Sequence, residues 1–102
     1  MSPLRLSALS VLAALISSPV WAGAEVIRTH PALTAYTKEY FIAYKHKAFA
    51  QSPSGSWAWR AERTSPEFAQ QDALAACEAF RKEGEAPCVV VNVDDEWVKS
   101  QP

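Results

Sequence analysis

The 102-residue chain is poor in the residues that build catalytic and metal sites, with two histidines, two cysteines and three glycines. A phosphate-binding loop needs several glycines within one short segment, and Gly23, Gly55 and Gly84 lie far apart. A metal site needs clustered ligands, and His30 and His46 stand apart from each other and from the cysteines. We therefore expect no metal ion and no cofactor.

Neither histidine is a good candidate for a general base. His30 lies in a short lead before the first predicted element, and His46 stands between Lys45 and Lys47, as is ordinary at the exposed start of a strand. The sequence thus predicts no catalytic residue and a protein that is not an enzyme. The alternative is a small enzyme or an enzyme inhibitor, whose polar centre would be His46 with the acidic segment 94–96.

Neither sign of charge is in excess, because Lys and Arg number 10 and Asp and Glu number 11. A nucleic-acid partner is therefore not expected. The longest acidic block, Asp94-Asp95-Glu96, lacks the alternating spacing and the glycine of a calcium-binding loop. It predicts a solvated turn.

The chain also lacks an apolar run of the length that spans a membrane, about 20 residues. Its most apolar segment, residues 6–16, follows the basic Arg5 and precedes the small residues Ala22 and Ala24. This arrangement predicts a signal peptide over residues 1–22, cleaved after Ala22 or, nearly as well, after Ala24. We expect an exported protein, periplasmic or secreted, with no membrane span after processing.

Residues 23–102 are expected to form one domain of roughly 80 residues, near the size at which a single core only just outweighs chain entropy. Cys77 and Cys88 are its cysteines, and an even count in an exported domain favours one disulfide over a metal site or a reactive thiol. Closing a loop of about a dozen residues stabilises such a fold by about 3 kcal/mol in the chain-entropy model.

The first predicted element is a helix that begins at Pro31. Its apolar stripe at helical spacing consists of Leu33, Tyr36, Tyr40 and Ala43 or Tyr44. The competing interpretation is a strand through residues 40–44, which are rich in residues that favour extended structure.

Residues 52–55 (SPSG) predict a hairpin turn, since Pro53 fixes one torsion angle and Gly55 accepts a positive one. The three-residue loop places Gln51 opposite Trp57 and Phe49 opposite Trp59. Alternation along the two strands then gives an aromatic face and an alanine face, formed by Phe49, Trp57 and Trp59 and by Ala48, Ala50 and Ala58, respectively.

Residues 64–84 are the segment that most clearly predicts a helix. Thr64 and Glu67 are spaced as a capping box, Ser65-Pro66 offers an alternative start, and Gly84 supplies a stop. The stripe that this helix buries is narrow and mostly small: Ala69, Ala73, Ala76, Cys77 and Phe80. Such a stripe permits close approach to the alanine face of the hairpin.

Residues 87–93 (PCVVVNV) predict a third strand. Its two faces consist of Cys88, Val90 and Asn92 and of Val89, Val91 and Val93. A bridge from Cys88 to Cys77 turns the first set toward the alanine face and adds the second set to the aromatic face. The predicted fold is α+β in the order helix, strand, strand, helix, strand, with a three-stranded sheet and one disulfide.

The aromatic face is too apolar to remain in water. Either the first helix covers it, so that the rings are core, or the cover is partial and leaves a groove for a glycan, a protein or a second copy of the chain. Trp97, beyond the third strand, is expected to fold back rather than stay exposed. The candidate binding residues are Trp57, Trp59, Tyr40, Tyr44 and Arg60.

Three stretches, HKAFAQSPSGSWAWR, SPEFAQQDALAAC and PCVVVNVDDEWV, resemble an exported bacterial domain of unknown function. Its pattern of K-A-F-A, G-x-W, A-x-x-x-A-L-x-x-C and a second cysteine is carried here by Lys47, Ala48, Phe49, Ala50, Gly55, Trp57, Ala69, Ala73, Leu74, Cys77 and Cys88. The chain departs from it at Glu62-Arg63, where a glycine often follows the hairpin.

Similar segments occur alone and appended to larger exported enzymes, so the resemblance implies an accessory or binding role. We therefore expect a non-enzymatic exported module that contacts an envelope protein or a cell-wall glycan through its aromatic hairpin. A structural homodimer that uses the aromatic sheet face is the further alternative.

Overall fold

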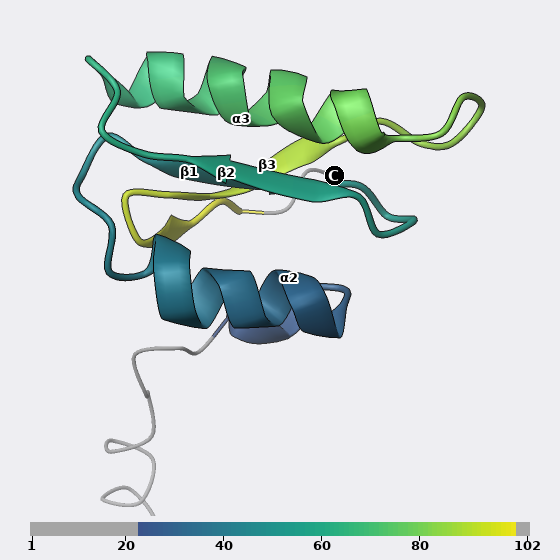
Figure 1. Cartoon of the computed structure of the whole chain (residues 1–102), viewed down its shortest axis with the longest axis horizontal. Helices are drawn as coiled ribbons and strands as arrows, with labels where there is room; N and C mark the ends of the chain where they lie inside the picture. The colour runs from purple at the N-terminus through teal and green to yellow at the C-terminus, as the bar shows by residue number, and fades with distance from the viewer. Residues whose placement is uncertain (1–22, 100–102) are drawn as a thin grey trace, which may run out of the picture.

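The computed structural model describes residues 23–99, so the predicted signal peptide lies outside the described residues. The elements are a 3-10 turn η1 (Ala24–Val26), helix α2 (His30–Ala35), a π-helical turn η2 (Tyr36–Tyr40), strands β1 (Ala48–Gln51) and β2 (Trp57–Arg60), helix α3 (Pro66–Phe80), and strands β3 (Val89–Val93) and β4 (Glu96–Trp97). The sheet lies between α3 on one side and α2 with η2 on the other (Figure 1). The α+β class is confirmed.

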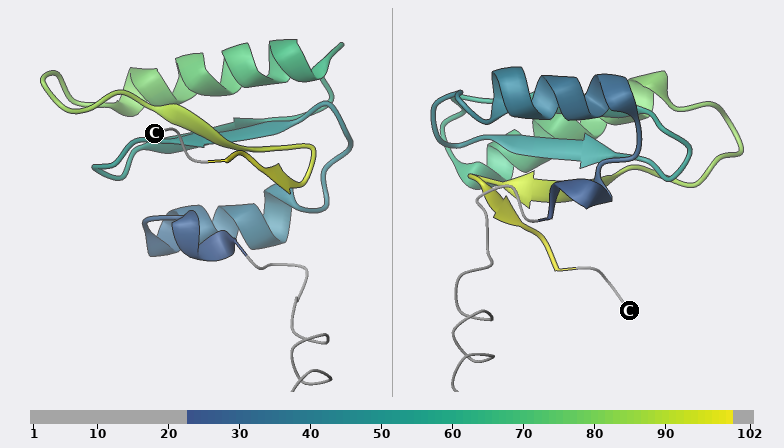
Figure 2. Two further views of the ribbon diagram at one scale, coloured as in Figure 1. Left: turned by 180° about the vertical axis from the view of Figure 1, so that it is seen from behind. Right: turned by 90° about the horizontal axis from the view of Figure 1, so that it is seen from below.

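The sheet within the described residues has four antiparallel strands in the order β2-β1-β3-β4, so the predicted count of three was wrong. The missed strand β4 forms a hairpin with β3 and lies at the edge of the sheet (Figure 2). Asp94 and Asp95 both have positive φ, 48° and 71°. Aspartate tolerates this conformation, and a two-residue turn of this kind closes a hairpin. The acidic segment is thus a turn as predicted, but the chain continues the sheet after it.

The predicted register of the β1–β2 hairpin is confirmed, with Phe49 opposite Trp59 and Gln51 opposite Trp57. The Ser52 N–H donates to the Ser56 carbonyl at 2.9 Å and closes the three-residue loop. Gly55 has φ 113°, the positive torsion for which a glycine was expected.

Helix α3 uses the alternative start. The Ser65 hydroxyl accepts the Phe68 N–H at 3.1 Å, and Pro66 occupies the first turn, where it needs no N–H partner. The predicted end was too late, because the helix stops at Phe80 and Gly84 lies in the turn that follows. Cys77 is bonded to Cys88, 11 residues away, so the chain must leave the helix soon after Cys77 and turn back.

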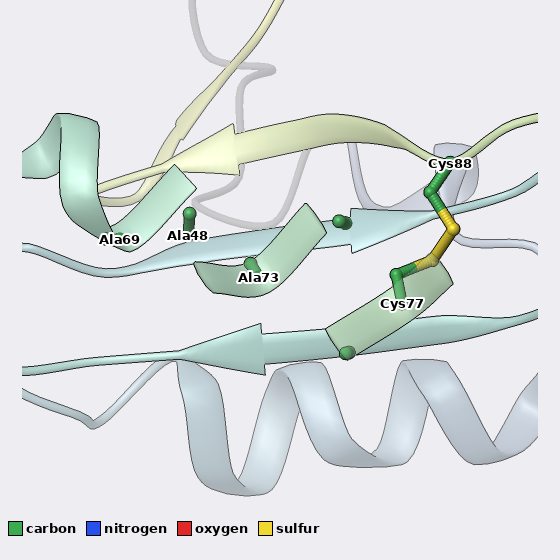
Figure 3. Close-up of a cluster of buried hydrophobic side chains, with 7 residues drawn as sticks. Ala48, Ala69, Ala73, Cys77 and Cys88 are labelled. Carbon is green, nitrogen blue, oxygen red and sulfur yellow. A yellow bond between two sulfur atoms is a disulfide. The ribbon is translucent and has the colours of Figure 1, made fainter. Parts of the chain in front are cut away.

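The alanine face packs on α3 as predicted (Figure 3). Both sides of the contact are small side chains, which lets the helix axis approach the sheet closely. The buried cluster consists of Ala48, Ala50, Ala58, Ala69, Ala73, Cys77 and Cys88. The predicted disulfide is present, with its Cα atoms 6.2 Å apart.

A bulge between β1 and β3 changes the predicted faces of β3. Ala50 pairs with Val90, but Phe49 pairs with Asn92, so β3 carries one extra residue at Val91. Beyond the bulge the alternation is reversed. Val93 therefore packs on the alanine side and Asn92 lies on the aromatic side, the opposite of the prediction from strict alternation.

The first helix covers the aromatic face, and the alternative of a strand at 40–44 is not adopted. The Thr29 hydroxyl caps it by accepting the Ala32 N–H at 3.2 Å. In the π-helical turn the Phe41 N–H donates to the Tyr36 carbonyl, five residues back. This wider turn brings Tyr36 and Tyr40 onto the buried side and leaves Leu33 at the surface, so the predicted stripe is right for the tyrosines alone.

Phe49 is at the centre of the aromatic cluster and is 0% exposed. Its ring centroid lies 5.8 Å from Tyr36, 5.5 Å from Tyr40 and 5.9 Å from Trp57. Trp97 folds back as expected, 5.1 Å from the Tyr36 ring. The aromatic face is therefore core to a large extent.

Candidate functional site

A cleft of about 900 Å³ follows β2, which is an edge strand. Its walls are the hairpin tip, β2, the segment after it and the end of α3, with Ala43 from the loop after η2. The lining residues used below are Ser54, Trp57, Trp59, Arg60, Phe80 and Lys82.

Backbone groups of β2 are directed into this cleft. Since Ser52 and Ser56 form a hydrogen-bonded pair, the antiparallel ladder directs the N–H and C=O of Ala58 toward β1 and those of Trp57 and Trp59 away from it. The Arg60 side chain forms a hydrogen bond with one of these outward groups: its Nη1 donates to the Trp59 carbonyl at 2.7 Å.

Trp57 and Trp59 belong both to the core and to the cleft, and both are partly exposed. The Trp57 ring is stacked on Phe49 with an interplanar angle of 5°. Because Phe49 lies on the neighbouring strand, the other face of the Trp57 indole is directed past the edge of the sheet. Trp59 makes an edge contact with Tyr40, with centroids 6.0 Å apart.

The structure brings three of the five predicted binding residues to the cleft: Trp57, Trp59 and Arg60. Tyr40 is 0% exposed, and its hydroxyl donates to Asn92 Oδ1 at 2.8 Å. Burial raises the pKa of Tyr40, and the charge of Asp95 raises it further. Tyr44 is 75% exposed but does not line the cleft.

Sequence reasoning missed the α3 side of the cleft. Phe80 was assigned to the buried stripe, yet it is 70% exposed, because the last turn of α3 reaches past the alanine face to the hairpin tip. Lys82 and Glu85 join it there, and Ser54 donates to Glu85 Oε1 at 2.7 Å. The sequence signal that could have indicated this wall is Phe80 itself, an aromatic residue three positions after Cys77, whose disulfide orients that end of the helix.

Both ends of the cleft carry acidic and basic side chains. Lys82 and Glu85 lie at the hairpin tip, and Arg60, Glu62 and Arg63 lie at the other end of β2. Arg63 pairs with Asp72 of α3 at 2.7 Å. Within the described residues, Arg60 and Lys82 form no ion pair, so their charges are available to a partner.

The lysine of the K-A-F-A segment has a structural role. Lys47 is 2% exposed, and its Nζ donates to the carbonyls of Tyr40 and Phe41, at 2.8 and 3.0 Å, which end the first helix. The same atom lies 2.9 Å from Asp95 Oδ1 in the β3–β4 turn and 4.7 Å from the centre of the Tyr40 ring. Lys47 thus joins the helix end, β1 and the second hairpin.

We expect Lys47→Met to destabilise the domain by about 2 to 3 kcal/mol, because it keeps the aliphatic stem but leaves the carbonyls of Tyr40 and Phe41 and the Asp95 carboxylate without their charged donor. Urea unfolding followed by fluorescence measures the loss. Lys45→Met, at an exposed position, is the matched control and should change stability by less than about 0.5 kcal/mol. Equal losses in the two variants would refute the role of Lys47.

His46 and Asp94, the polar centre of the enzyme alternative, are neighbours in space. His46 Nδ1 lies 3.9 Å from Asp94 Oδ2, but Asp94 Oδ1 accepts the backbone N–H groups of His46 and Lys47, at 2.6 and 2.9 Å. The carboxylate thus holds the start of β1, where His46 has φ 63°. These hydrogen bonds explain the contact between His46 and Asp94 without a catalytic role.

The described residues contain no group of three or more His, Cys, Asp or Glu side chains that could hold a metal ion. Residues 23–99 also contain no helix long and apolar enough to cross a membrane. Comparisons with protein-family models, with curated proteins and with solved structures found no significant match.

Proposed function

We propose that this chain is a non-enzymatic binding module of the cell envelope, exported by residues 1–22, which contacts its partner through the cleft along β2. One observation carries this proposal. A single cleft of about 900 Å³ contains two half-buried tryptophans, an arginine without an ion pair and backbone groups directed away from the sheet. Tryptophan and arginine dominate the binding energy of protein interfaces.

The partner is an envelope protein or a cell-wall glycan. The outward face of Trp57 offers an apolar platform of the kind that stacks on sugars or anchors a protein side chain. Charges of both signs at the rim supply hydrogen bonds to either partner. The disulfide agrees with an oxidising compartment, and the resemblance to exported accessory segments supports the same role.

Trp57 and Trp59 are poor positions at which to test binding, because their loss also disturbs the core around Phe49 and Tyr40. Phe80→Ala and Arg60→Ala alter exposed side chains of the cleft and should leave the domain folded. We expect each to weaken capture of the partner about fivefold or more, as truncation of a hot spot costs more than about 1 kcal/mol.

The measurement immobilises the oxidised, processed protein and incubates it separately with solubilised envelope proteins and with purified cell-wall sacculi. Ile42→Ala, an exposed apolar position outside the cleft, is the control and should bind like the parent. Circular dichroism verifies that all variants are folded. If the parent, Phe80→Ala and Arg60→Ala capture equal amounts of the partner, the contact lies elsewhere and the proposal is wrong.

A further inference from the structure

We propose that a second copy of the chain pairs with the same cleft, β2 against β2 in antiparallel orientation, so that two four-stranded sheets become one continuous sheet. The inference rests on the proposed function in one respect. Self-pairing would cover the cleft along β2 that we propose as the partner site, so the dimer would be the form that does not bind the partner. The other edge of the sheet ends in β4, two residues long, whereas β2 presents four.

The backbone of β2 is compatible with this pairing. Trp57 and Trp59 have outward N–H and C=O groups, and placing Trp57 of one copy opposite Trp59 of the other lets each such pair exchange both hydrogen bonds. Ala58 then lies opposite itself on the two-fold axis, where its small side chain leaves the strands free to approach.

Repulsion between like charges favours this register over the one that places Trp59 on the axis. With Trp59 opposite itself, the two Arg60 residues would be two positions apart along the paired strands, about 7 Å, and would repel each other. With Ala58 on the axis they are four positions apart, about 14 Å, and each Arg60 lies opposite Ser56 of the second copy.

Charge at the two ends of β2 is complementary under this symmetry. Antiparallel pairing brings the hairpin tip of one copy to the far end of β2 in the other. Arg60, which lies on the α3 side of the sheet opposite Ala48, then meets Glu85, which Ser54 holds at the tip. Lys82 meets Glu62 in the same way. The symmetry axis produces both ion pairs twice.

The helices do not obstruct the contact. Helix α3 packs mainly on β1 and β2, so the two α3 helices would lie two strand spacings apart, about 10 Å. The Arg63–Asp72 ion pair shows which flank of α3 faces the β2 edge. Helical spacing puts Phe68, Ala75 and Ala79 on that flank, all exposed, so the large Phe68 is opposite small side chains of the second helix.

Arg60 also admits a protective interpretation, since its guanidinium on the Trp59 carbonyl blocks an edge acceptor. The two interpretations predict opposite signs. If Arg60 only protects the edge, then Arg60→Ala uncovers the carbonyl and increases self-association. If Arg60 pairs with Glu85 of the second copy, the same substitution weakens the dimer.

The test exports the full-length chain in a bacterial host, purifies the processed, oxidised protein and measures its mass by light scattering and sedimentation over a range of concentrations. We expect a concentration-dependent dimer. Arg60→Glu and Glu85→Arg should each raise the dimer Kd about tenfold or more, and the double variant, which restores the ion pair with its signs exchanged, should return within about threefold of the parent. Glu39→Arg, an exposed charge reversal on η2, is the matched control and should leave the Kd unchanged.

A mass of one chain up to about 1 mM protein overturns the inference. So does a dimer that Arg60→Ala strengthens, or one whose Kd does not respond to the charge exchange. A monomer that still captures an envelope partner through Phe80 and Arg60 overturns self-pairing and leaves the proposed function intact. Capture is also measured below the dimer Kd, where the cleft is free. A chain that dimerises but captures neither envelope proteins nor sacculi at that concentration overturns the proposed function and leaves self-pairing intact.

Discussion

Phe49→Ala is expected to leave most of the protein unfolded at room temperature. Phe49 is 0% exposed and contacts the rings of Tyr36, Tyr40 and Trp57, so truncation opens a cavity between the sheet and the first helix. Loss of a buried phenylalanine costs about 3 to 5 kcal/mol. A core of this size rarely supplies more than about 3 to 5 kcal/mol in total, so little stability remains.

The matched control is Phe80→Ala, the same chemical change at a side chain that is 70% exposed. It should alter the free energy of unfolding by less than about 0.5 kcal/mol. Near-ultraviolet circular dichroism and urea unfolding compare the two variants. A cost below about 1 kcal/mol for Phe49→Ala would mean that the aromatic face is not a core, and the three-layer arrangement would then be wrong.

The local parts of this fold could be predicted from the sequence because each depends on a few adjacent residues. The hairpin register follows from Pro53 and Gly55, and the alternation of faces follows from that register. The packing of α3 on the alanine face followed from small residues at matching periods and from the disulfide. These predictions needed no information about distant contacts.

The errors came from features that local patterns do not encode. A bulge at Val91 is invisible in a valine run, and it exchanged the faces of Asn92 and Val93. The π-helical turn is fixed by packing of Tyr36 and Tyr40 on Phe49, not by helix propensity. A two-residue turn of Asp94 and Asp95 requires two successive positive φ angles, which the pairing of β3 with β4 stabilises.

The candidate site was predictable in part for the same reason. Trp57, Trp59 and Arg60 lie on one strand, so the hairpin alone brought them together. The α3 wall, with Phe80 and Lys82, depends on where the helix ends relative to the hairpin tip. That distance is set by the disulfide and by the turn that leads to Cys88, neither of which has a periodic signal.

The disulfide loop has a second anchor, the carboxylate of Glu78. Its Oε1 accepts from Arg81 Nε at 2.6 Å, and its Oε2 accepts the Cys88 N–H at 2.7 Å. The hydrogen bond from Arg81 and that from Cys88 lower the pKa of Glu78 below its usual range. Because the pKa is lower in the folded state, this stabilisation is complete above the ordinary pKa of glutamate and is lost as the pH falls through the lowered value.

Replacing both cysteines, Cys77→Ala with Cys88→Ala, should lower the free energy of unfolding by about 3 kcal/mol, since the open chain recovers the loop entropy that the bridge removes. Both side chains are buried beside Ser56, and alanine fits there without a new polar group. Glu78 is then one of the contacts that still hold the loop, together with those of Ser54 and Arg81 to Glu85, so the double variant should be most stable at neutral pH and lose further stability in acid. Urea unfolding of parent and variant, at neutral pH and near pH 4, measures both effects.

A double variant as stable as the parent would mean that α3 and the strands alone fix the position of the loop between Cys77 and Cys88. In that case the α3 wall of the cleft, with Phe80 at its end, would be positioned by packing of the alanine face rather than by the bridge.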